Sequence, residues 1–375
     1  MTFDTASVWP PCPASFNMAA HVLQAGAQHP NKSALLELAR DGSVRKDWSY
    51  GQLITAVRGT AAGLISAGAR PGDHVLMRLG NRADFPITYL AAIAAGLVAV
   101  PTSPDLTDAE ITAMSAVIQP KLVLQDPRIS APRDHAATVI SSDDLRTFHN
   151  LPPQPWHMGD PGRPAYIVFT SGTSGAPRAV VHGHRAIWAR GMMHDGWYGL
   201  KEQDHLMHAG AFNWTFTLGT GLMDPWTKGA TALIPAPGTP PDMLGRLLAN
   251  HEVTLFAAAP GVLRKMLQAH IPPLPDLRHA LCAGEKLPEA IRASWKTATG
   301  TEIYEAFGMS ECSTFLSASP GKPAATGTLG RPQPGRQIAL LDETGARSPD
   351  GDVGEICVHK SDPGLMLEYF GAPQA

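Results

Sequence analysis

Cysteine is scarce in this sequence, and neither sign of charge prevails. Four cysteines occur in 375 residues and no two are spaced as C-x-x-C, which argues against a cysteine-rich zinc site and a disulfide framework. The formal net charge is -3, with acidic and basic residues mixed, so the chain lacks the extended basic surface of a nucleic-acid-binding protein. We therefore expect reduced cysteines, a small-molecule ligand and no nucleic-acid partner. A homodimer is compatible with these properties and is left open.

The sequence also lacks a long hydrophobic segment. Its longest apolar stretch, residues 89–100, is well short of the roughly 18 to 20 residues that cross a bilayer as a helix. The first residues carry no basic patch followed by an apolar run, so no secretion signal is expected. We predict no membrane-spanning helix, and a cytoplasmic location is the default.

What the sequence does contain is a regular alternation of helix and strand patterns. Between residues 49 and 104, amphipathic stretches alternate with short apolar ones, which is typical of an α/β fold with a parallel, doubly wound sheet. Helices are expected from residue 50 and at about 84–96, and strands at 74–77 and 98–101.

Breaker residues divide the chain into three predicted units. Residues 151–164 hold five prolines and two glycines, too many for a helix or a central strand. A second α/β run follows, and after residue 327 short alternating segments predict a small barrel-like unit. The predicted units are residues 1–164, 165–325 and 326–375, with strands of the second unit at 230–234, 255–258 and 279–282.

The most informative segment, residues 166–178, joins an apolar strand to a loop of small residues and reads YIVFTSGTSGAPR. Glycines let backbone N–H groups turn inward, hydroxyls can donate to oxygens, and Arg178 supplies positive charge; together these suit a polyphosphate. A Ser/Gly linker is the alternative, but a strand leading directly into the loop is not typical of a linker. No Gly-Lys-Ser/Thr closes the loop, which excludes the P-loop of kinases and GTPases.

This segment closely resembles the phosphate-binding motif of the ANL superfamily of adenylate-forming enzymes, typically T-S-G-T-S-G-x-P-K with a later histidine. Here His184 stands at the histidine place and Arg178 replaces the lysine, so a planar fork replaces a point charge. The resemblance implies phosphate contacts from Thr170, Ser171, Gly172, Thr173, Ser174, Gly175 and Arg178.

A second segment, residues 304–311 (YEAFGMSE), resembles the Y-G-x-T-E motif of that family. The resemblance implies that Glu311, together with Thr170, holds magnesium, an ion that prefers hard oxygen ligands. It also implies that Ser310 donates to the α-phosphate and that Phe307 packs against the adenine. The remaining implied nucleotide contacts in this segment are Glu305, Ala306 and Gly308.

Two further segments resemble family blocks. Residues 281–288 (LCAGEKLP) resemble the turn that walls the adenine and one side of the acyl pocket, although a strand, a glycine turn and a proline-started helix would give a similar sequence for structural reasons alone. Residues 354–358 and 364–369 resemble a later block that usually ends G-Y, with Glu368 in the place of that glycine. The contacts implied by the first block are Ala283, Gly284, Glu285 and Lys286.

Residues 211–219 occupy the place where the family lines its acid pocket. Asn213 stands where amino-acid-activating relatives have an aspartate, and an uncharged side chain cannot compensate a buried ammonium, so an α-amino acid is disfavoured. Residues 313–321 and 327–332 look most like the benzoate–CoA ligase branch. Trp214 and Phe216 would suit an aryl acid; alternatively they fill core, because such pairs are common in strands, and a short aliphatic acid remains possible. The implied pocket residues are Phe212, Trp214, Phe216, Ala283, Gly284, Gly308 and Met309.

Two histidine pairs, His182/His184 and His205/His208, could suggest a metal site. No third ligand stands at metal-site spacing, and an exposed helix turn would explain the second pair. We interpret both pairs as structural or pocket-lining residues.

The resemblance implies the large N-terminal domain of an ANL enzyme, with two doubly wound α/β sheets packed in layers plus a small distorted β-barrel. The small C-terminal domain, with a ribose-binding aspartate and a mobile lysine, is expected to be absent. The chain alone is therefore expected to fold but to have negligible ligase activity.

The implied reaction has two steps: a carboxylate attacks the α-phosphate of ATP to give an acyl-adenylate, and CoA then displaces AMP. Catalysis would be positioning and electrostatic stabilisation by Thr170, Ser171, Ser310 and Glu311. The alternatives are transfer to a carrier protein instead of CoA, and a non-catalytic adenylate-binding module.

Overall fold

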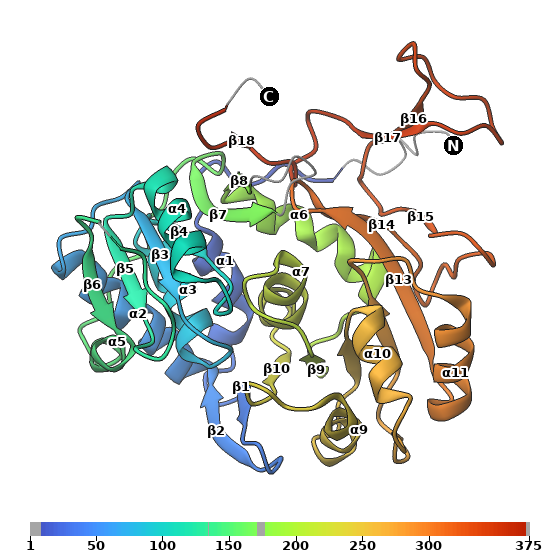
Figure 1. Ribbon diagram of the computed structural model, residues 1–375, viewed down its shortest axis with the longest axis horizontal. Helices are drawn as coiled ribbons and strands as arrows, with labels where there is room; N and C mark the ends of the chain where they lie inside the picture. The colour runs from blue at the N-terminus through green and yellow to red at the C-terminus, as the bar shows by residue number, and fades with distance from the viewer. Residues whose placement is uncertain (1–8, 134, 171–176, 373–375) are drawn as a thin grey trace.

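The computed structural model describes residues 9–133, 135–170 and 177–372, in which strands form a nine-stranded and a seven-stranded sheet (Figure 1). Helix α1 (Met18–Ala27) lies between the two sheets, where it packs against α3 (Asp84–Ala94) of one layer and α8 (Asp224–Thr227) of the other. A mixed α/β fold with layered sheets is therefore confirmed.

The seven-stranded sheet carries the strand that precedes the glycine-rich loop. Its first five strands in space run parallel. β7 then turns back into β8, which runs antiparallel to it, and β18 pairs antiparallel with the outer edge of β8. In spatial order the strands are β6 (Thr138–Ser141), β5 (Leu122–Gln125), β3 (His74–Arg78), β4 (Val98–Pro101), β7 (Pro164–Thr170), β8 (Arg178–Gly183) and β18 (Glu368–Tyr369).

The nine-stranded sheet carries the other predicted motifs. Its central strands are parallel and buried, as expected for short apolar runs covered on both faces. In spatial order the strands are β15 (Arg331–Pro332), β14 (Ser313–Ser317), β13 (Glu302–Met309), β12 (His279–Cys282), β11 (Leu255–Ala257), β9 (His205–His208), β10 (Thr231–Ile234), β1 (Ser33–Leu38) and β2 (Val44–Ser49).

Local sequence accounts for where several helices begin. Helix α2 (Tyr50–Ser66) starts at a capping box, in which the Ser49 hydroxyl accepts from the Gln52 amide and the Gln52 side chain accepts from the Ser49 amide. The other helices are α4 (Asp108–Ile118), α5 (Ser142–Phe148), α6 (Arg185–Met193), α7 (Thr215–Leu218), α9 (Pro241–Asn250), α10 (Pro260–Met266), α11 (Glu289–Thr299) and the π-helical turns η1 (His194–Tyr198) and η2 (Gly219–Met223). Among the described residues, no helix combines the length and the apolar character needed to span a membrane.

Most predicted elements of the sheets are confirmed. The strands expected at 230–234, 255–258 and 279–282 are β10, β11 and β12, and the helix expected at 84–96 is α3. The sheets combine segments that are distant in sequence: β1 and β2 join the nine-stranded sheet, whereas β7 and β8 join the seven-stranded one. Both sheets thus contain strands from either side of residue 164.

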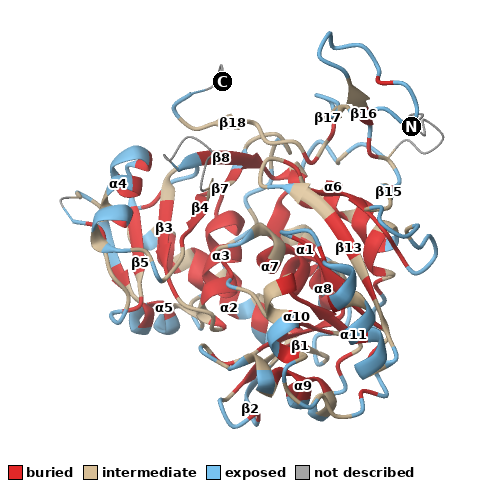
Figure 2. Ribbon diagram, turned by 45° about the vertical axis from the view of Figure 1, so that its right-hand side comes forward, coloured by how far each residue is buried: buried red, intermediate tan, exposed pale blue. Residues whose placement is uncertain are grey.

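The predicted β-barrel at residues 326–375 is wrong, since the described strands of this segment form no closed barrel. β16 (Ile338–Leu341) pairs only with β17 (Glu355–Val358), while β15 and β18 join the two different large sheets. Alternating hydrophobicity predicted the strands but not their partners. Figure 2 shows that most of the segment around β16 and β17 is exposed or half-buried, so the two strands enclose no large core of their own.

Candidate active site

The glycine-rich loop connects two antiparallel strands. Thr170, the last residue of β7, pairs with Arg178, the first residue of β8. The predicted contacts Ser171, Gly172, Thr173, Ser174 and Gly175 lie outside the described residues. The sheet thus places the two ends of the loop, Thr170 and Arg178, next to each other.

Tyr369 connects this hairpin to the second motif. The Arg178 guanidinium lies 5.2 Å from the centre of the Tyr369 ring, a cation–π distance, and β18 pairs with β8. The Tyr369 hydroxyl donates a 2.8 Å hydrogen bond to Oε1 of Glu311, and burial, followed by this bond, raises the pKa of Tyr369. Arg178 and Glu311, 133 residues apart in sequence, are therefore brought together by one tyrosine.

The turn that carries Ser310 and Glu311 is held on several sides. Nε2 of His182 donates a 2.7 Å hydrogen bond to the Ser310 carbonyl, and the Met366 amide donates one of 2.7 Å to the Glu311 carbonyl. At the end of the turn, Arg190 donates to the Ser313 hydroxyl. This turn is therefore positioned by residues of β8, α6 and the segment before β18.

Gly308 is required by the close return of the chain after this turn. A Cβ at Gly308 would lie 2.1 Å from the Ser313 carbonyl oxygen and 2.5 Å from Cα of Thr314. Real Cβ atoms do not approach backbone so closely, so any side chain here would push β13 and β14 apart. The glycine of the second motif thus has a packing reason of its own.

A buried ion pair anchors the segment that carries Tyr369. The side chains of Arg336 and Asp362 are fully buried and lie 2.5 Å apart, and Asp362 also accepts from the Gly364 amide at 2.8 Å. A second Arg336 nitrogen donates to the Thr314 carbonyl at 3.2 Å. The pair therefore joins the segment before β18 to strand β14.

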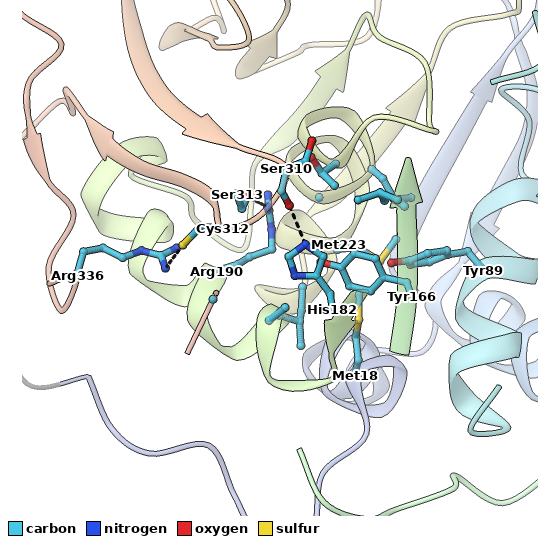
Figure 3. Close-up of a pocket in the computed structure, with 17 residues that line it drawn as sticks. Met18, Tyr89, Tyr166, His182, Arg190, Met223, Ser310, Cys312, Ser313 and Arg336 are labelled. Atoms are coloured by element: carbon cyan, nitrogen blue, oxygen red, sulfur yellow. Dashed lines mark hydrogen bonds between the residues drawn. The ribbon is translucent and has the colours of Figure 1, made fainter. Parts of the chain in front are cut away.

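Beneath Ser310 lies a cavity of about 30 Å³, shown in Figure 3. Its wall combines polar and apolar side chains from both layers of the fold. Among the residues that line it are Tyr89, Tyr166, His182, Arg190, Ser310 and Ser313.

A buried polar network surrounds Arg190 at this cavity. Asp224 accepts from Nε of Arg190 at 2.9 Å and from Nη2 at 2.5 Å, and the Tyr198 hydroxyl also donates to Asp224, at 2.7 Å. Burial alone would raise the pKa of Asp224, but the adjacent Arg190 lowers it below its usual value. Gly219 makes room for the guanidinium, since a Cβ there would lie 2.3 Å from the Arg190 Cζ. Tyr198 ends η1 and Gly219 begins η2, and π-helical turns frequently occur at functional sites.

The histidine pairs have other partners than a metal. His184 accepts from the Met18 amide at 3.0 Å, and His208 accepts from the Gly210 amide at 2.9 Å. Our explanation of His205 and His208 as an exposed helix turn is wrong: both lie on strand β9, and His208 is buried. The apolar residues between them, Leu206 and Met207, are both fully buried and belong to two different core clusters, as expected for neighbouring residues of a strand covered on both faces.

These histidines make stability depend on pH. Burial lowers the pKa of His182 to about 4 and those of His184 and His208 to about 3, against 6.5 for an exposed ring. Between pH 6.5 and about 4 the unfolded chain binds more protons, so the free energy of unfolding should fall as pH is lowered through this window. Urea denaturation at pH 7.5, 6.5 and 5.5 measures this slope. His208→Asn should reduce it, whereas the same change at exposed His270 should not; equal slopes in all three proteins would contradict the assignment.

Some of the residues predicted to wall the adenine are exposed, and others are buried and make structural contacts. Gly284, Glu285 and Lys286 are exposed, whereas Glu305 is buried. Glu305 accepts from the Leu287 amide at 2.9 Å and pairs with an arginine of α11, so it holds the 284–288 turn against β13. Ala283 and Ala306 are buried beside it, and Phe307 packs edge-on against Phe315.

The predicted acid-pocket residues do not all gather in one place. Phe212 is buried against Phe85, and Phe216 stacks on Trp197. Trp214 is 48% exposed and lies beside Gly284, where a Cβ would come within 3.8 Å of its ring. Met309 is 39% exposed on the strand that also carries Gly308. The alternative that both aromatics fill core holds for Phe216, which packs against a buried cluster, and is wrong for Trp214, which is half-exposed. Its strand rationale is wrong, because helix α7 begins directly after Trp214.

Sequence reasoning missed Tyr369, Arg190 and the contact of His182 with Ser310. Tyr369 stood within a family block, which was a usable signal. No sequence signal pointed to Arg190, because its partner Asp224 lies 34 residues away on another helix.

Comparison with known proteins identifies the family of this chain. The family model described as "AMP-binding enzyme" matches residues 22–370. Two curated relatives, 3-hydroxybenzoate–CoA ligase of Aromatoleum sp. (strain CIB) and benzoate–CoA ligase of Thauera aromatica, are 25% and 27% identical over 87% of this chain, which spans 66% of each of them.

The solved structure of a benzoate CoA ligase from Burkholderia xenovorans LB400 is 26% identical and superposes with a TM-score of 0.85, covering 95% of this chain and 73% of that one. The match extends over nearly all of the described residues and includes both large sheets. The resemblance to the ANL superfamily is confirmed, and the chain belongs to the family of AMP-binding enzymes.

Proposed function

We propose that this protein activates a carboxylic acid with ATP to an acyl-adenylate and transfers the acyl group to CoA. The observation that carries the proposal is the convergence of Arg178, Tyr369 and Glu311 at the end of the glycine-rich hairpin. A guanidinium and a carboxylate thus lie close together there. Ser310, which precedes Glu311, and Thr170, which pairs with Arg178, add hydroxyl groups. Such an arrangement suits a polyphosphate and its counter-ion.

In this mechanism the protein acts by binding and orientation. Arg178 neutralises phosphate charge, and Ser310 donates to the α-phosphate while His182 and Met366 hold its turn in place. The acid carboxylate is itself the nucleophile, so no side chain forms a covalent bond.

Magnesium fits the donor set. Tyr369 occupies Oε1 of Glu311, which leaves Oε2 and the Thr170 hydroxyl as hard oxygen ligands beside the phosphates. The ion would neutralise the departing pyrophosphate. Ser310 and Arg178 would still orient the nucleotide.

Isotope exchange of pyrophosphate into ATP, dependent on an added acid and measured on the chain joined to the C-terminal segment of a relative, tests the first step. Thioester formation with free CoA, compared with a phosphopantetheinylated carrier domain, tests the second. Exchange without thioester on CoA would favour the carrier, and ATP binding without any exchange would favour a non-catalytic module.

We further propose that the chain by itself turns over poorly, because none of the lysines in its described residues lines the cavity beneath Ser310. Lys286 and Lys322 are both exposed. Adding the C-terminal segment of a relative should raise thioester formation. Equal rates with and without that segment would show that the required cation is already present.

An aryl acid is supported by the curated relatives, which are named for benzoate and 3-hydroxybenzoate. Trp214, half-exposed beside Gly284, would lie against the ring. Trp214→Ala is expected to shift preference toward bulkier acids, because it removes the largest side chain at that wall. A panel of aryl and aliphatic acids in the exchange assay measures this. Trp188→Ala, which removes a half-buried tryptophan of α6 packed against Phe16 and His21, serves as the control for the loss of an aromatic side chain. An unchanged rank order in Trp214→Ala would place the pocket elsewhere.

A further inference from the structure

The cavity beneath Ser310 contains hydrogen-bonding groups that the protein itself leaves unused. Nε2 of His182 faces the Ser310 carbonyl, which can only accept, so Nε2 must carry the ring proton. Nδ1 is therefore an unprotonated acceptor. It is buried and has no hydrogen-bond partner among the described residues. A buried acceptor without a partner is unfavourable, which favours a group that donates to it.

Hydroxyl groups face the same cavity. Ser313 accepts from Arg190, and its own proton has no acceptor in the described ranges. Tyr89 lines the cavity and is 1% exposed, and Figure 3 shows its hydroxyl pointing toward the neighbouring Tyr166. No hydrogen bond of the Tyr89 hydroxyl is found within the described part of the chain. The cavity thus offers one acceptor and at least two hydroxyls that can donate or accept.

Charge and size restrict what can enter. Arg190 is already matched by Asp224, so a second carboxylate in the cavity would bring an uncompensated charge. A purely apolar group would leave the His182 acceptor unpaired. At about 30 Å³ the cavity holds roughly two waters, whereas a cavity that binds benzene in another protein measures about 150 Å³. A hydroxyl group fits, and a ring does not.

We propose that the acid activated at this site carries an uncharged hydroxyl group on the side away from its carboxylate. This hydroxyl enters the cavity, donates to Nδ1 of His182 and accepts from Ser313 or Tyr89. The acid's carbon skeleton stays outside, toward Ser310. The inference rests on the proposed activation of a carboxylic acid and names the class of that acid.

Matched acids test the proposal: benzoate, and its 3- and 4-substituted hydroxy, methyl and carboxy derivatives. Isothermal titration calorimetry in the presence of AMP gives a dissociation constant for each, whether or not turnover occurs. At one of the two positions, the hydroxy acid should bind at least about tenfold more tightly than the methyl acid of similar size. The carboxy acid should bind more weakly than the hydroxy acid.

Tyr89→Phe removes one cavity hydroxyl without changing the ring, and it should lower the hydroxy-to-methyl preference by about fivefold. The matched control is Tyr50→Phe, a buried tyrosine whose hydroxyl donates to the Ala230 carbonyl at 2.6 Å, away from this cavity. That change should lower stability but leave the preference unaltered.

The outcomes separate this inference from the proposed function. Acids that bind and support pyrophosphate exchange without a hydroxyl preference would overturn the inference and leave the proposed function standing. If no acid binds and none supports exchange, both fail. A preference that Tyr89→Phe and Tyr50→Phe change equally would show that the cavity is not where the hydroxyl is recognised.

Discussion

Glu311→Gln should slow acid-dependent pyrophosphate exchange more than a hundredfold, equivalent to about 3 kcal/mol, which is typical for the loss of one preorganised electrostatic contact. Glutamine keeps the size of the side chain and can still accept from the Tyr369 hydroxyl, which donates to Oε1 of Glu311 at 2.8 Å. What it loses is the negative charge that would hold a cation beside the phosphates. The effect should therefore appear in exchange and not in the urea denaturation midpoint.

Two matched variants make this result specific. Glu355→Gln removes the exposed carboxylate of strand β17 and should leave exchange unchanged. Tyr369→Phe keeps the carboxylate but removes its hydrogen bond, so it should weaken Mn²⁺ binding, followed by electron paramagnetic resonance, less than Glu311→Gln does. Unchanged exchange in Glu311→Gln at saturating magnesium would remove Glu311 from the site.

Asp224→Ala should lower the free energy of unfolding by about 4 kcal/mol, because it leaves the buried Arg190 without its counter-charge. Both side chains are buried, and Arg190 donates two hydrogen bonds to this carboxylate, at 2.9 and 2.5 Å. Tyr198 would lose its acceptor as well. Urea denaturation at pH 7.5 measures the change.

The double variant Arg190→Met/Asp224→Leu tests whether the cost comes from the unpaired charge. Removing both charges together should restore a large part of the stability lost in Asp224→Ala, since apolar replacement of a whole buried pair is often nearly neutral. Asp143→Ala, at an 80%-exposed partner of Arg146, is the surface control and should have no measurable effect. A double variant less stable than Asp224→Ala would show that packing, not charge, dominates.

Local patterns predicted the elements of this fold better than their partners. The strand at His279–Cys282 was predicted at its observed bounds, because a short apolar run ending at a glycine turn leaves few alternatives. Trp214 and Phe216 were compatible with a strand, and only tertiary packing makes the residues after Trp214 a short helix. The prediction of a barrel at residues 326–375 was wrong for the same reason. The alternation of apolar and polar residues along β16 and β17 does not determine which sheet these strands join.

The candidate site shows the same division. Glu311 and Arg178 could be selected because their segments resemble motifs of the ANL superfamily. That Tyr369 lies between them follows from the pairing of β18 with β8, a contact between segments almost 190 residues apart. The tautomer of His182 depends on a carbonyl 128 residues away and has no local sequence signal.

The π-helical turn η2 has a consequence for chain length. Its hydrogen bond runs from the Asp224 amide to the Gly219 carbonyl, so this turn holds one residue more than an α-helical turn. Each residue rotates a helix by about 100°, so deleting one residue from η2 would restore regular helical bonding while turning Asp224 away from Arg190. The helix would become more regular, but the buried Arg190 guanidinium would lose its counter-charge. Evolution can exchange side chains in this segment more easily than it can shorten it, and homologues that retain both charged residues should also retain the spacing of 34 positions between them.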